Sequence, residues 1–257
     1  MTSVANESKS EEESGHFSEL LKVEGKLALR EPYGVFGIAL PVVLLVLFWF
    51  IGAQEPGNIG STGYTVLGLY IPTIMVIGFS TIALGLPNGL IRDREIGWLR
   101  RVSTTPVHPS RLLAAQMILN TIFAFVMILI VVFGGEEIFG AALNVNIPLF
   151  VISIGLSIGV IFSLGLVVAA IAPSQTAGSA LGGLFFFGLL FLSGLWIQPA
   201  MVGGVLATVM YYSPAGAASQ ALLYSVFNTA VPYAALATMV VYAVLFAFIA
   251  TRYFRWE

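Results

Sequence analysis

The residues of this chain that could do chemistry are concentrated in one short stretch, from Arg92 to Arg111. Its sequence, RDREIGWLRRVSTTPVHPSR, holds seven of the chain's 11 basic and 13 acidic residues, together with a tryptophan. Only 9% of the chain is charged, so this local density stands out. Arginine and tryptophan dominate binding at many protein–protein interfaces. The composition therefore predicts a surface on which another protein docks.

A second interpretation of the same stretch is that it fixes the membrane topology and contacts lipid headgroups, as basic loops commonly do. Arginines alone would serve that purpose. Here Glu95 and Trp98 accompany them, and Arg92 lies three residues before Glu95, a spacing that allows the two to pair on a helix. We therefore favour the docking surface.

Groups suited to catalysis are scarce in the rest of the chain. The only histidines are His16 and His108, and there is no cysteine. Ser193, in the sequence LSGLW, has no base near it in the sequence. Because a nucleophile requires a base, and acid–base chemistry requires a titratable group, we expect this chain to have no catalytic site and no metal site.

The overall composition is that of a membrane protein. The chain has 257 residues, of which 58% are hydrophobic, and a mean hydropathy of +0.95. Soluble domains are about 45–50% apolar. The net charge of -2 offers no basic surface for nucleic acid. We therefore expect a lipid bilayer, and no nucleic acid, among the partners of this chain.

Six uninterrupted apolar stretches without a charged residue or histidine reach the length of about 20 residues that a membrane-spanning helix needs. Strict alternation, the pattern of a membrane barrel, is missing. Between the fifth and sixth stretches, MVGGVLATVMYY is too short to span and suits a re-entrant external helix. The prediction is an all-α integral membrane protein with six transmembrane helices. Its expected spans are 33–53, 64–91, 112–133, 147–172, 177–198 and 231–251.

Charge placement predicts which side each loop faces. With the N-terminus in the cytoplasm, every lysine and arginine falls on the inside, while the outer loops carry only Glu55, Glu136 and Glu137. This split follows the positive-inside rule. A seventh span would place Arg252 and Arg255 outside. Both termini are therefore expected in the cytoplasm.

The N-terminal segment is polar and does not have the pattern of a cleaved signal sequence. Residues 1–14 are expected to form a disordered tail, and residues 15–257 a single membrane domain. Within 15–31, Phe17, Leu20 and Leu21 fall on one side of a helix, which predicts an amphipathic helix on the membrane surface. A simple juxtamembrane extension is the alternative.

The spans also bear on how transport would be energised. An ion-driven carrier usually relies on ionisable residues within the membrane, and these spans have none. Pro72 or Pro87 could still break a helix, so a self-contained carrier or channel built on a broken helix stays open as an alternative. Gly178 and Gly182, four residues apart, would allow close helix packing.

Three motifs occur in order along the chain: REIGWLRRVSTTP before the third span, APSQTAG between the fourth and fifth, and YYSPAGAASQALL after the fifth. With the surface helix and six spans, this order resembles the membrane permeases of type-2 ATP-binding-cassette (ABC) exporters, the group that includes antibiotic and daunorubicin exporters. That family carries a Glu-x-Gly-x-x-x-Arg-like element followed by Thr-Pro or Ser-Pro. Glu95, Gly97, Arg101 and Pro106 occupy those places here. One departure is the lack of intramembrane charge, which in some relatives helps define the substrate.

The resemblance implies an exporter powered by separate cytoplasmic ABC ATPase subunits, which bind ATP and Mg²⁺. This chain itself would bind no cofactor and would not be an enzyme, in agreement with its lack of a G-x-x-x-x-G-K-[ST] motif. Two permeases, identical or paralogous, would pair in a prokaryotic cell membrane. The expected cargo is a hydrophobic or amphipathic drug, antibiotic or lipid. A lipid-linked polysaccharide is the rival cargo.

The resemblance also implies roles for particular residues. Ser213 and Pro214 would mark a break between two re-entrant helices that close the outer mouth. Aromatic residues on the first, second and fifth spans are candidates for the substrate path, although contact with lipid explains them equally well. The path candidates are Phe48, Phe79, Phe186 and Phe191. Trp98, Leu99 and Arg101 would form the docking ridge for the ATPase, and Arg94 and Glu95 would anchor it at the helix end. The full set of residues expected to couple the permease to the ATPase is Arg94, Glu95, Trp98, Leu99, Arg101 and Pro106 in the loop, and Phe17, Leu20 and Leu21 in the surface helix.

Overall fold

A computed structural model describes residues 32–54, 64–95 and 109–253 of the chain. All regular structure in these three ranges is helical, and they contain six spans that are long and apolar enough to cross a membrane. The predicted fold class is thereby confirmed. The expected tail 1–14 and surface helix 15–31 lie outside the described residues.

The six spans are α2 (Pro32–Gln54), α3 (Val66–Ala83) continued by α4 (Gly85–Glu95), α6 (Pro109–Phe133), α7 (Ile147–Ile171), α8 (Gln175–Leu192) and α11 (Tyr233–Tyr253).

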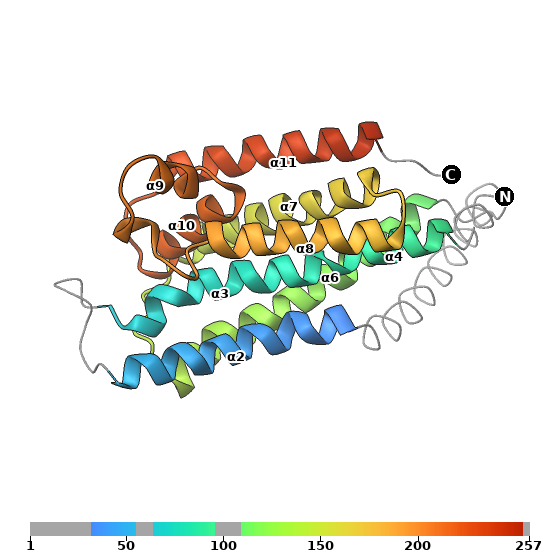
Figure 1. The fold of residues 1–257 in the computed structure, drawn as a ribbon. Coiled ribbons are helices and arrows are strands. Elements are labelled where there is room, and N and C mark those ends of the chain that lie inside the picture. Colours follow the sequence, from blue (N-terminus) through green and yellow to red (C-terminus); the bar gives the residue numbers. More distant parts are fainter. Residues whose placement is uncertain (1–31, 55–63, 96–108, 254–257) are drawn as a thin grey trace, which may run out of the picture.

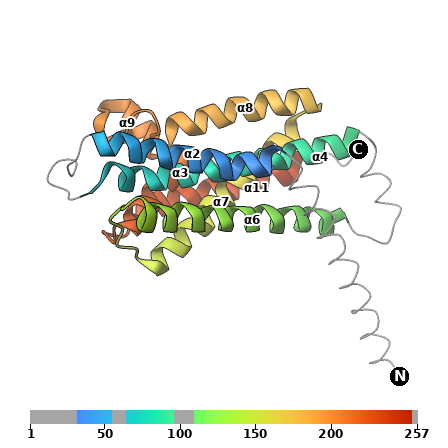
Figure 2. The same cartoon turned by 90° about the horizontal axis from the view of Figure 1, so that it is seen from below.

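The long helices lie roughly side by side in one elongated bundle (Figure 1). At one end lie the last turns of α4 and α11 and the turn that joins α7 to α8; at the opposite end lie the short helices α9 (Gly204–Tyr211) and α10 (Pro214–Val226). The view turned by 90° agrees (Figure 2). We call the first the arginine end, because α4 ends with Arg92 and Arg94 and α11 with Arg252. The second is called the α9–α10 end.

Helix α3 forms the centre of the bundle. It packs against α2, α6, α7 and α10, and the consecutive residues Ile74, Met75 and Val76 are all fully buried. A helix that is apolar all round is buried all round. The other long helices leave apolar side chains such as Val43, Phe125 and Val241 exposed, as expected where a helix contacts lipid.

The second span is broken at Leu84, between α3 and α4. Pro87 has no backbone N–H, so it cannot donate the helical hydrogen bond that the carbonyl of Ala83 would otherwise accept. This carbonyl lies against α7: a Cβ atom added to Gly165 would be 2.8 Å from the Ala83 oxygen. Asn88 Nδ2 donates to the next carbonyl, that of Leu84, at 2.8 Å. Pro72, in contrast, lies inside α3 without ending it.

Helix α8 is shorter than the apolar stretch from which it was predicted. It ends at Leu192, whereas the expected span ran to residue 198. The cause is Gly194, whose φ of 90° follows the C-cap residue Ser193. Glycine adopts this left-handed conformation at no steric cost and commonly ends helices there. Hydropathy alone does not predict a helix end of this kind.

Candidate functional site

The last turn of α4 binds the turn between α7 and α8. The guanidinium of Arg94 donates a hydrogen bond through Nη2 to the carbonyl oxygen of Ala172, the C-cap residue of α7. The adjacent carboxylate of Glu95 accepts one from the backbone N–H of Gln175, the first residue of α8, at 2.8 Å. A cation thus meets the carbonyl end of one helix and an anion the amide end of the next, which is the favourable arrangement for both helix dipoles. We call this pair of contacts the turn clamp.

One turn before the clamp, α4 packs closely on α8. Ser179 Oγ donates to Asn88 Oδ1 at 2.9 Å. A Cβ atom on Gly178 would be 2.3 Å from Ile91 Cδ1, so only glycine fits here without a shift of Ile91. A Cβ atom added to Gly182 would likewise be 2.9 Å from Leu84 Cδ2. The glycine spacing therefore serves close helix approach, and its partner is α4.

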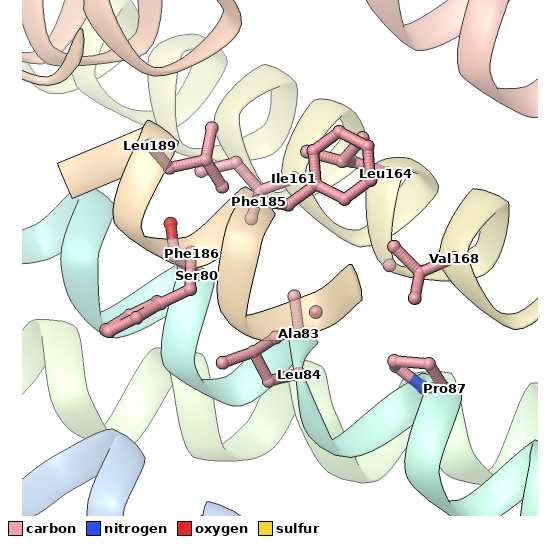
Figure 3. A pocket seen from close by; sticks show the side chains of 12 residues that line it. Ser80, Ala83, Leu84, Pro87, Ile161, Leu164, Val168, Phe185, Phe186 and Leu189 are labelled. Carbon is pink, nitrogen blue, oxygen red and sulfur yellow. The ribbon is translucent and has the colours of Figure 1, made fainter. Parts of the chain in front are cut away.

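A small cavity, partly open to the surroundings, lies where α3 and α4 meet α7 and α8. Figure 3 shows Ala83, Leu84 and Pro87 on one side and Leu164 and Val168 of α7 across from them. Among the described lining residues, Ser80 alone has a polar side chain, and its hydroxyl donates to the carbonyl of Val76 at 2.7 Å. The cavity therefore offers an apolar surface. Its lining consists of Ser80, Ala83, Leu84, Pro87, Ile161, Leu164, Gly165, Val168, Gly182, Phe185, Phe186 and Leu189.

A second small cavity lies near the α9–α10 end and has uncharged polar groups. Thr73 Oγ1 lies 3.0 Å from Ser219 Oγ and donates to the carbonyl of Ser193 at 3.3 Å. Gln220 Nε2 donates to the carbonyl of Tyr211 at 3.2 Å. These hydrogen bonds join α3, α8, α9 and α10 without a buried charge.

The helix break between α9 and α10 is built from local backbone chemistry. Ser213 Oγ accepts a hydrogen bond from the N–H of Gly216 at 3.0 Å and so caps α10, and Pro214 occupies its first turn. Both residue types are favoured at these positions. A Cβ atom on Gly216 would lie 1.8 Å from the carbonyl oxygen of Met210. The tight turn therefore requires glycine.

The family model for the ABC-2 type transporter matches residues 16–227, most of the chain. The chain belongs to the ABC-2 type transporter family. Its matched region is the membrane-spanning permease component of an ABC transporter, which works with an ABC ATPase. A search of the curated proteins found no match.

Two of the residues expected to couple this permease to the ATPase lie in the described part of the chain. They are Arg94 and Glu95. Both contact the α7–α8 turn, Arg94 from a half-buried position and Glu95 from an exposed one. The others lie outside the described residues. These are Trp98, Leu99, Arg101, Pro106, Phe17, Leu20 and Leu21.

The four aromatic residues expected along the substrate path of the permease are not brought together. Phe79 is fully buried in the core. Phe48 is buried and stacks on Tyr70, with ring centroids 3.9 Å apart. Phe191 is 41% exposed on α8. Only Phe186 lines the apolar cavity.

Sequence reasoning missed several residues of this permease that the structure brings together. Phe185 lines the apolar cavity next to Phe186, and its signal in the sequence is its place in the aromatic run of α8. Asn88 and Ser179 gave a faint signal, since each is a polar residue within an apolar segment. Gly165 gave no signal in the sequence. It approaches the carbonyl of Ala83, which lies on another helix.

Proposed function

We propose that this permease exports a hydrophobic or amphipathic compound, such as a drug, an antibiotic or a lipid, from the cytoplasm or the inner leaflet of a prokaryotic cell membrane. Separate ATPase subunits, which hold ATP and Mg²⁺, supply the energy. A second permease, identical or paralogous, completes the transporter. The observation that carries this proposal is the apolar cavity between α3, α4, α7 and α8.

The chemistry of that cavity supports an apolar cargo. Ligand sites are mostly apolar with a few polar groups that set orientation. Here the polar contribution is the Ser80 hydroxyl, whose hydrogen is already bonded within α3. Such a lining would bind hydrocarbon or aromatic groups and would give a free ion too few oxygen ligands. It therefore supports an apolar cargo over the ion-coupled carrier.

The distribution of charge supports an orientation with the arginine end in the cytoplasm. Arg92, Arg94 and Arg252 occupy that end. Glu136 and Glu137 lie in η2 (Gly134–Ile138), which follows the far end of α6 (Figure 1). Basic residues are retained on the cytoplasmic side of membrane proteins. The ATPase would then dock at the arginine end, on the surface helix 15–31 and on the ridge of Trp98, Leu99 and Arg101 that follows α4.

A reconstituted complex tests the proposal. The permease and its ATPase are placed in vesicles of phosphatidylethanolamine and phosphatidylglycerol, and the movement of a fluorescent apolar dye is followed with and without ATP. We expect movement that requires ATP. Val168→Phe, which fills the apolar cavity, should lower the rate severalfold by excluding the dye. Ile152→Phe introduces a phenylalanine at an exposed position of α7 and should leave the rate unchanged.

Three outcomes contradict the proposal in different ways. Full dye transport by the permease alone, without nucleotide, would show a self-contained carrier. ATP-dependent movement of a lipid-linked oligosaccharide with none of the dye would assign the rival cargo. Equal rates in the Val168→Phe and Ile152→Phe variants would remove the cavity from the transport path.

A further inference from the structure

Helix α4 continues α3 within one span, with Leu84 between them: Leu84 keeps helical backbone angles and its N–H donates to the carbonyl of Ser80 at 3.2 Å. The break at Leu84 leaves the Ala83 carbonyl without its helical donor, because Pro87 has no N–H. The backbone hydrogen bonding that makes a helix rigid is therefore interrupted at this point. Small changes of backbone angle at the end of a helix are a common form of hinge.

Beyond the break, α4 is held by α7 and α8. It packs more extensively on these two helices than on α3. Asn88 bonds Ser179 on α8, and the turn clamp joins Arg94 to Ala172 and Glu95 to Gln175. The connection thus runs from the middle of α4 to its last residue. Each of these contacts joins segments 78 to 91 residues apart in the sequence.

The clamp is formed by two neighbouring side chains of opposite charge, and each contacts backbone. Backbone acceptors and donors at helix ends move with the whole helix, so a pull on Arg94 or Glu95 acts on α7 and α8 themselves. Hydrogen bonds with one charged partner are also stronger than neutral ones. The contacts are therefore suited to carrying a displacement between helices.

We propose that Arg94 and Glu95 are positioning residues that fasten the α7–α8 turn to α4, so that the two move as one unit relative to α3, with Leu84 as the hinge. This inference rests on the proposed coupling to an ATPase at the arginine end. It connects that coupling to the cargo, because the apolar cavity lies between the two parts. Its lining comes from α3 on one side of the hinge and from α4, α7 and α8 on the other.

The absence of cysteine from the chain allows a direct test. The pair N88C/S179C replaces the hydrogen bond between α4 and α8 by two thiols that can be oxidised to a disulfide. In this background, Arg94→Ala with Glu95→Ala removes both side chains of the clamp. Transport, ATP hydrolysis and copurification of the ATPase are each measured in the reduced and the oxidised complex.

We expect the reduced clamp variant to lose about tenfold in ATP-driven dye transport, the effect of losing one or two hydrogen bonds with a charged partner. ATP hydrolysis and copurification should persist. Oxidation should restore transport, because the disulfide takes over the fastening. With an intact clamp, oxidation should leave transport unchanged. Arg94→Lys keeps a cation beside Ala172, so its rate of ATP-driven dye transport should remain close to that of the parent.

Other outcomes overturn the inference. Copurification that is lost in the clamp variant and not restored by oxidation would mean that Arg94 and Glu95 bind the ATPase directly. An oxidised parent that no longer transports would mean that α4 must slide along α8. A reduced clamp variant with normal transport would show that the clamp has no positioning role. Nucleotide-independent transport by the parent would instead contradict the proposed function, and is measured first.

Discussion

The two ends of this permease are held together by different chemistry. At the arginine end, the charged side chains Arg94 and Glu95 bind the backbone of the α7–α8 turn. At the α9–α10 end, the contacts are neutral: Asn146 Nδ2 donates to Asn228 Oδ1 at 2.9 Å, and the Asn146 N–H donates to the carbonyl of Ser225 at 2.8 Å. Neutral groups satisfy the backbone of short helices without burying a charge.

The contacts at the α9–α10 end are expected to stabilise the fold, and those at the arginine end to transmit movement. Ser213 and Asn146 cap α10 and α7, and each side chain accepts from an N–H of the helix that it begins. Removing such contacts should affect the folding of the α9–α10 end. The charged contacts each join a side chain to backbone, and Arg94 and Glu95 lie at half-buried and exposed positions, where solvent and salt screen the charge. Their loss should change transport more than stability.

The largest effect is expected from Gly216→Ala, which tests whether the α9–α10 end depends on close backbone packing. The added Cβ would be 1.8 Å from the Met210 carbonyl oxygen, so α9 and α10 must separate. We expect a loss of more than about 3 kcal/mol, in the range of severe steric and core mutations. Thermal unfolding in detergent measures it. Gly203→Ala, with open space around it, is the matched control, and equal stability of both variants would contradict the packing.

A smaller effect is expected from Gly165→Ala, which places a methyl group 2.8 Å from the Ala83 oxygen at the break. The methyl group must push α7 away from the hinge, at a cost of about 1–3 kcal/mol, as for other overpacked sites. In the same helix, Gly155→Ala meets open space and should stabilise by about 0.5–1 kcal/mol through helix propensity. Unfolding curves that shift in the same direction for both variants would exclude the close approach.

The smallest effects on stability are expected from Asn146→Ala and Glu95→Gln, which alter one contact at each end. Asn146→Ala should lower stability by about 1 kcal/mol through loss of the cap of α7, with little dependence on salt. Glu95→Gln should change stability by less than about 1 kcal/mol, and that difference should shrink in high salt. Both are followed by thermal unfolding over a series of salt concentrations. Similar salt dependence for the two variants would mean that the ends do not differ as described.

Much of the fold follows from the sequence because crossing a bilayer requires long apolar helices. The six spans and the helix break at Ser213 and Pro214 were predicted from run length and the resemblance. Pro72 and Pro87 were both named as residues that could break the second span, and only Pro87 follows the interruption at Leu84. The helix end at Leu192 was missed. It depends on a single glycine, Gly194, within a stretch that stays apolar to residue 197.

The candidate site was harder to predict than the fold. Arg94 and Glu95 were recognised as interaction residues, but their contacts were not, because both bind backbone atoms, and backbone atoms leave no mark in a sequence. Hydropathy also cannot say which side of an apolar helix faces a cavity. Phe79 and Phe186 are equally aromatic, yet one is enclosed by the core and the other lines the cavity.

Helix α7 is tethered at both of its ends. Its N-cap residue Asn146 is bonded to the segment that ends α10, and its C-cap residue Ala172 is bonded to Arg94. With 25 residues, it is about 37 Å long, enough to traverse the hydrocarbon of a bilayer. An axial displacement imposed at one membrane face therefore reaches the opposite face along one stiff rod, and no relay through neighbouring helices is required.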